Sequence, residues 1–133
     1  MKKATEAWLD FAHRDLEAAK LLVDHEYVSN AVLFHSQQCV EKCLKALLEE
    51  ADVPVPQLHN SIVKLHPFLL EEAGISLSLG EDELDLLDAV YIDTRYPSGI
   101  GLLPSGFLAK EDARGLLKIA EKVYRETVTR LSG

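Results

Sequence analysis

The helical character of this chain is clearest in the stretch Gln37-Gln38-Cys39-Val40-Glu41-Lys42-Cys43-Leu44-Lys45-Ala46-Leu47-Leu48. Its apolar residues recur at spacings of three and four, which places them on one face of an α-helix. The other face carries Gln38, Glu41, Lys42, Lys45 and Glu49. We expect that face to be solvated, with an ion pair between Glu41 and Lys45, or else to form a polar site for a ligand or partner. The pattern predicts a helix over residues 28–50.

The same periodicity predicts four further helices. They span residues 5–25, about 60 to 73, 81–94 and 109–131. Pro67 should kink or divide the second of these, and Gly74 should end it. Short connections between amphipathic helices favour antiparallel neighbours. We therefore predict an all-α fold, an antiparallel up-and-down bundle of four to five helices that forms a single domain over residues 1–133.

Composition and charge limit the classes of ligand and the cellular locations that the sequence allows. The chain has 133 residues and a net charge of −8, which argues against binding long nucleic acid through bulk basicity. A small basic pocket for one nucleotide or a short RNA remains compatible with this charge. Apolar runs are too short for a membrane span, and the N-terminus lacks the apolar core of a signal peptide. The sequence predicts a cytoplasmic protein with no membrane partner.

His35, Cys39 and Cys43 share one side of the predicted helix over residues 28–50. Ligands at i, i+4 and i+8 spread along about 12 Å of helix axis, too far to hold one ion. A disulfide between Cys39 and Cys43 is also disfavoured, because i,i+4 Cβ atoms lie about 5–6 Å apart and a bridge needs roughly 3.5–4.5 Å. We expect no metal, no cofactor and two reduced thiols on a buried face.

Two other positions suggest polar contacts. Asp15 lies beside the apolar stripe of the first helix, and a buried carboxylate needs a partner, for which Lys42 or Arg95 are candidates. A structural ion pair, a ligand-positioning role and simple exposure are all open for Asp15. Arg95 and Tyr96 stand near the end of the helix predicted for 81–94. Arg suits a bidentate phosphate contact and Tyr can stack a base, although the pair could equally anchor the helix end.

Several of these motifs occur together in a known family. Gln37-Gln38, Glu41-Lys42 and Lys45-Ala46-Leu47-Leu48 follow Asp15-Leu16 and precede Leu58-His59 and Arg95-Tyr96-Pro97. In this order and spacing the chain resembles, over nearly its whole length, the HEPN family, named for nucleotide binding in higher eukaryotes and prokaryotes. The resemblance implies a bundle of four or five helices, usually dimeric, in which the first helices and the Arg-bearing segment line a cleft.

Many members of that family are metal-independent ribonucleases with an Arg, four to six further residues and then a His. There the Arg would stabilise the charge of the transition state and the His would move the proton of the 2′-hydroxyl. Arg95 occupies the place of that Arg, but the corresponding His positions hold Ile100, Gly101 and Leu102. The ribonuclease site therefore does not carry over. Non-catalytic members are commonly encoded beside a minimal nucleotidyltransferase, with which they form toxin–antitoxin-like complexes.

Three hypotheses follow from the sequence. In the first, a non-catalytic, homodimeric HEPN protein binds a nucleotide or RNA segment and pairs with a minimal nucleotidyltransferase. Its ligand-binding residues would be Gln38, Lys42, Lys45, Arg95 and Tyr96. The second is a divergent ribonuclease toxin that uses Arg95 with a His from elsewhere, such as His35 or His59. The third is a purely structural module whose acidic surface docks a partner.

Overall fold

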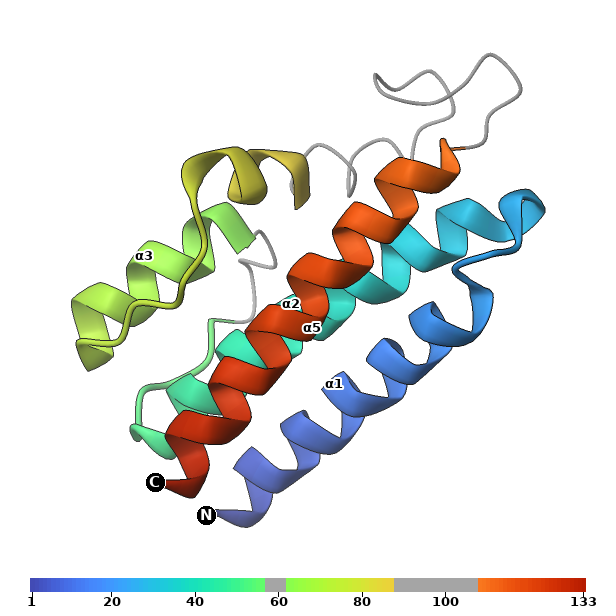
Figure 1. Ribbon diagram of the computed structural model, residues 1–133. Helices are drawn as coiled ribbons and strands as arrows, with labels where there is room; N and C mark the ends of the chain where they lie inside the picture. Colours follow the sequence, from blue (N-terminus) through green and yellow to red (C-terminus); the bar gives the residue numbers. More distant parts are fainter. Residues whose placement is uncertain (57–61, 88–107) are drawn as a thin grey trace.

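Three long helices run side by side in the computed structural model, which describes residues 1–56, 62–87 and 108–133 (Figure 1). They are α1 (Lys3–Leu22), α2 (Ser29–Glu50) and α5 (Lys110–Ser132). A shorter helix, α3 (Ile62–Ala73), packs against α2, and a 3₁₀ turn, η1 (Glu26–Val28), links α1 to α2. Residues 81–87 are also helical, and the described ranges contain no strand. The predicted all-α fold is confirmed.

Hydrogen bonds at the helix ends fix the directions of the three long helices. The backbone N–H of Lys2 and the hydroxyl of Thr5 both donate to Glu50 Oε1, at 3.0 and 2.9 Å, so α1 begins where α2 ends. Leu108 N–H donates to Ser29 Oγ at 3.1 Å, so α5 begins where α2 begins. α1 is therefore antiparallel to α2 and α5, which run in the same direction. The long connection between α2 and α5 lets the chain return to the far end of the bundle, and both termini lie at one end (Figure 1).

Helix α2 is central, and it is enclosed by α1, α3, α5 and η1. Its apolar residues on the predicted inner face are all buried. The solvated outer face expected from the sequence is wrong for Glu41 and Lys45, which are only 5% and 8% exposed. A buried charge must be paired. Lys45 Nζ accordingly lies 3.2 Å from Glu41 Oε2 and 5.2 Å from the centre of the Trp8 ring of α1.

The helix boundaries differ in places from the prediction. α1 ends at Leu22 rather than at residue 25, because the chain turns there and Asp24 pairs with Arg114 of α5 at 2.8 Å. α3 is one helix that continues through Pro67 instead of dividing there. The predicted stop at Gly74 is confirmed: it has a φ of 69°, the left-handed region that favours glycine. The expected beginning of α3 near residues 60 and 61, and helix residues 88–94, lie outside the described residues.

An ion pair ties the helical residues 81–87 to α5. Both carboxylate oxygens of Glu83 accept hydrogen bonds from Lys122 Nζ, at 2.8 and 2.9 Å. Glu83 Oε1 also accepts from the backbone N–H of Gly80 at 3.0 Å, which caps the helix start. The bond from Lys122, with a smaller contribution from Gly80, holds the pKa of Glu83 below its ordinary value, against the opposing effect of partial burial.

This lowered pKa predicts a pH-dependent stability. A carboxyl whose pKa is lower in the folded than in the unfolded protein stabilises the fold above its unfolded pKa, here near 4.5, and loses that effect as the pH falls through the folded value. Glu83→Gln keeps an oxygen for Gly80 but removes the charge. We expect it to lower the free energy of unfolding by about 0.5 kcal/mol at neutral pH, because the pair is partly exposed.

Urea denaturation of both proteins across the pH range measures this effect. The difference between wild type and Glu83→Gln should be constant above pH 6 and shrink as the solution is acidified below the ordinary glutamate pKa. A difference that stays the same, or grows, at acidic pH would contradict the role given to this ion pair.

Candidate functional site

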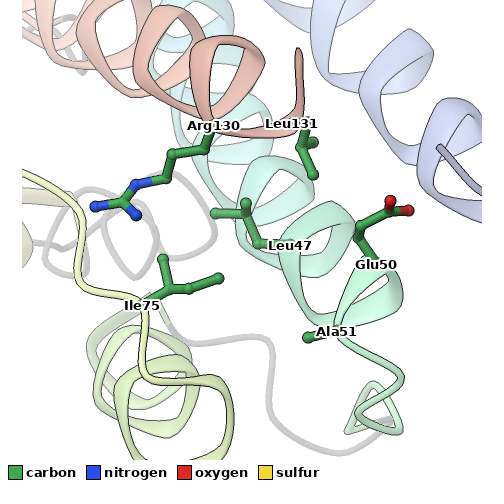
Figure 2. Close-up of a pocket in the computed structure, with 6 residues that line it drawn as sticks. All are labelled: Leu47, Glu50, Ala51, Ile75, Arg130 and Leu131. Atoms are coloured by element: carbon green, nitrogen blue, oxygen red, sulfur yellow. The ribbon is translucent and has the colours of Figure 1, made fainter. Parts of the chain in front are cut away.

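A pocket of about 290 Å³ opens between the last turns of α2 and α5 (Figure 2). It is lined by Leu47, Glu50, Ala51, Ile75, Arg130 and Leu131. Its charged residues both serve the fold. Arg130 donates to the carbonyl of Ser76 at 3.0 Å, and Glu50 accepts from the start of α1, which lowers its pKa. The polar groups of this pocket are therefore largely used in joining chain segments, and the stronger candidate site lies elsewhere.

That candidate lies along the contact between α1 and α2. α1 contributes Trp8, Phe11 and Asp15 at positions i, i+3 and i+7, and α2 contributes His35, Gln38, Lys42 and Lys45 at i, i+3, i+7 and i+10. Each set follows one side of its helix. Because the helices are antiparallel, Trp8 meets Lys45 while Asp15 meets Lys42 and His35. We call these seven residues, with Arg14, the α1–α2 face.

Asp15 is the centre of the α1–α2 face. It is 8% exposed, and its two carboxylate oxygens have different partners on α2. Oδ2 lies 2.5 Å from Lys42 Nζ, and Oδ1 lies 2.7 Å from His35 Nδ1. Of the two partners expected for Asp15, Lys42 is thus in contact with it, and Arg95 lies outside the described residues. One carboxylate thereby sets the positions of an ammonium group and an imidazole.

Beside this cluster lies an aromatic ring with two cations near it. Phe11 is 48% exposed, as are several other large apolar side chains of the described residues. The guanidinium of Arg14 lies 5.6 Å from the ring centre and Lys42 Nζ lies 5.8 Å from it. These distances are within the range of cation–π attraction. An exposed ring flanked by positive charge can stack a planar group and attract an anion attached to it.

The structure brings together three of the five predicted ligand-binding residues. Gln38, Lys42 and Lys45 follow one side of α2, and the Gln38 amide donates to Gln37 Oε1 at 2.7 Å. Lys42 is partly exposed at the surface, whereas Lys45 is buried beneath Trp8 with Glu41. Arg95 and Tyr96 lie outside the described residues.

Sequence reasoning did not place Phe11, Arg14 and His35 in this group. It assigned His35 to a buried side of α2 with the cysteines. The signal that could have found them is the i, i+3, i+7 spacing of Trp8, Phe11 and Asp15, repeated on α2 in the opposite order. Such matched spacing predicts facing residues only once the two helices are known to be antiparallel.

The two cysteines have no part in the α1–α2 face. Cys39 and Cys43 are free and completely buried. A hydrogen bond with Cys43, together with burial, raises the pKa of the Cys39 thiol far above its ordinary value, so it is not a reactive thiolate. Among the described residues, no group of three His, Cys, Asp or Glu side chains is arranged to hold a metal ion.

Comparison with known proteins agrees with this fold. The sequence model of the HEPN domain matches residues 5–131. The chain belongs to the HEPN family. A protein of Methanocaldococcus jannaschii named "Putative toxin MJ1304" is 32% identical to it over 136 residues, which cover 91% of this chain and 84% of that protein. The crystal structure of ST0689, an archaeal HEPN homologue, is 27% identical, with a TM-score of 0.68 over 98% of each chain.

In this HEPN protein some of the motif residues that carry the family resemblance serve the fold. Glu41-Lys42 and Lys45 supply charges that are paired within α2 or with α1. None of the helices in the described ranges is long and apolar enough to cross a membrane.

The position of Asp15 predicts an effect on stability. Asp15→Asn keeps the shape of the side chain but leaves the ammonium group of Lys42 without its counter-charge in a mostly buried place. We expect the free energy of unfolding to fall by about 1–3 kcal/mol, the range for a buried polar group that loses its partner.

Urea denaturation at neutral pH measures this change. The matched control is Asp10→Asn on the same helix, because Asp10 pairs with Arg14 at 2.9 Å but is exposed. The control should change stability by no more than about 0.5 kcal/mol. Equal changes in the free energy of unfolding for the two substitutions would show that the buried pair stabilises the fold no more than the exposed pair does.

Proposed function

We propose that this HEPN protein binds a short RNA segment or a nucleotide on its α1–α2 face, without cleaving it. The observation that carries the proposal is the half-exposed ring of Phe11 with Arg14 and Lys42 close to it. A nucleotide combines a planar base with an anionic phosphate, and this arrangement offers a partner to each. The Gln38 amide adds a hydrogen-bonding group on the same side of α2.

The charge of the whole protein is compatible with a small ligand of this kind. A net charge of −8 opposes a long polyanion, whose affinity depends on many phosphate contacts. A single nucleotide or a few nucleotides need only one or two cations and a stacking surface. In this proposal Lys42 contacts phosphate, while the charge of the buried Lys45 is balanced by Glu41. Arg95 and Tyr96 would complete the site with a second phosphate contact and a second stacking ring.

We also propose a role in a toxin–antitoxin-like system in the cytoplasm, with a minimal nucleotidyltransferase as partner. The support is membership of the HEPN family and the similarity to the Methanocaldococcus protein whose name describes a toxin. The absence of a His at the required spacing after Arg95 favours binding over catalysis. Homodimerisation is part of the proposal, since large apolar side chains such as Tyr27 and Phe34 are exposed on the single chain.

Binding is tested with a fluorescein-labelled, single-stranded ribo-oligonucleotide and fluorescence anisotropy at low salt. We expect Phe11→Ala to weaken affinity about 5- to 150-fold, because the stacking of one base on an aromatic ring contributes roughly 1–3 kcal/mol. The same samples, incubated without metal and resolved by electrophoresis, should contain intact RNA.

The matched control is Leu21→Ala, which removes an apolar side chain that is 77% exposed on the same helix, away from Phe11. It should bind as wild type does. If the wild-type protein changes neither the anisotropy of RNA nor, in calorimetry, the heat of added ATP at millimolar concentration, the binding proposal fails. Metal-free cleavage of the RNA would replace it with the ribonuclease hypothesis.

The proposed assembly has a separate test. Sedimentation at micromolar concentration should give a mass twice the 14.8 kDa of one chain. Co-expression with the product of the neighbouring gene should yield a stable complex if that gene encodes a small nucleotidyltransferase. A species of one chain's mass across the concentration range would contradict the dimer, and an unrelated neighbouring gene would contradict the proposed partner.

A further inference from the structure

We propose that His35, held in one orientation by Asp15, accepts a hydrogen bond from the ribose hydroxyl of the bound ligand and so selects RNA over DNA. This inference rests on the proposed binding function and adds to it the residue that recognises the sugar. It assigns to the α1–α2 face a third contact, beside the stacking ring of Phe11 and the phosphate contact of Lys42.

The contacts of Asp15 determine which nitrogen of His35 carries the hydrogen. Asp15 Oδ2 is in an ion pair with Lys42 Nζ at 2.5 Å, and Oδ1 lies 2.7 Å from His35 Nδ1. An ionised carboxylate can only accept hydrogen bonds, so Nδ1 must be the donor in that contact. In the neutral ring the other nitrogen, Nε2, then has a lone pair and is an acceptor.

Nε2 is available for a ligand. The His35 side chain is 30% exposed, and in the described part of the chain Nε2 makes no hydrogen bond. Nε2 is also not one of the buried polar atoms without a partner in the described residues, so solvent reaches it. An acceptor that faces solvent, on a ring fixed through its other nitrogen, is already oriented for a ligand donor. Preorganisation of this kind reduces the entropy lost on binding.

The position of His35 matches the place of a sugar. His35, Gln38 and Lys42 lie on one side of α2, and Asp15 touches both His35 and Lys42. Lys42 Nζ and the Phe11 ring centre are 5.8 Å apart. Lys42 therefore touches both the Phe11 ring and Asp15, the carboxylate that orients His35. In this proposal a nucleotide whose base stacks on Phe11 and whose phosphate meets Lys42 extends along this side of α2, with its sugar beside His35. The 2′-hydroxyl is the donor that a ribose has and a deoxyribose lacks.

The test compares two labelled single strands of the same uracil-free base sequence, one of RNA and one of DNA, by fluorescence anisotropy. Wild type should bind the RNA strand more tightly. His35→Ala should lose about 3- to 10-fold of its affinity for RNA, the value of one hydrogen bond, and keep its affinity for DNA. A strand with 2′-O-methyl groups, which lacks the donor, should behave as the DNA strand does with both proteins.

His13→Ala is the matched control, because His13 is an exposed histidine of α1 that pairs with Glu17 and stacks on Tyr124. It should keep the wild-type preference for RNA. Equal binding of the RNA and DNA strands by wild type, or an equal loss on both in His35→Ala, overturns the inference while the binding function stands. If wild type binds neither strand, the binding function itself has failed.

A ligand-free measurement tests the orientation of the ring. Nitrogen-15 spectra of the histidine side chains should show His35 with a protonated Nδ1 and an unprotonated Nε2 at mildly alkaline pH. In Asp15→Asn the preference for this tautomer should weaken, and with it the preference for RNA. A His35 ring whose Nε2 carries the hydrogen in wild type would overturn the inference directly.

Discussion

The enclosure of α2 is the constraint on which the other features of this protein depend. Helices pack on several sides of it, so its polar residues cannot all reach water, and each buried charge needs a partner nearby. Glu41 pairs with Lys45 along the helix, and Lys42 pairs with Asp15 of α1. Asp15 can do so only in one register of α1 against α2. The pairing of charges and the apolar packing therefore specify the same arrangement of the two helices.

The sequence predicted the helices well because apolar spacing is a local property. The inner face of α2 and the stop at Gly74 follow from residue types within one or two turns. The fate of the outer face of α2 was not predictable in this way. Whether Glu41 is solvated depends on what packs over it, and the residue pattern of one helix does not determine which other helices pack against it. Similarly, α2 and α5 run in parallel because of a long connection, whose path local patterns do not determine.

The candidate site was predictable only in part for the same reason. Lys42 and Gln38 were identified from the family motif, whereas Phe11 and His35 matter because of where the antiparallel helices bring them. Asp15 was recognised from its place beside an apolar stripe, and the need of a buried carboxylate for a partner led to Lys42. The requirement for a counter-charge predicts one partner for Asp15 but not the second contact, with His35, because one cation already compensates the charge of the carboxylate.

The parallel course of α2 and α5 has a consequence for the entropy of the chain. α1 and α2 form a hairpin joined by a few residues, while the contact of α5 with α2 closes a loop that begins after residue 50 and ends before residue 110. Closing a longer loop costs more chain entropy. The α1–α2 face, with all of its described residues on the hairpin, therefore depends on the most local contacts of the protein. Helix α5, which completes the core, must overcome the larger entropic cost. Its buried residues are apolar except for Thr127.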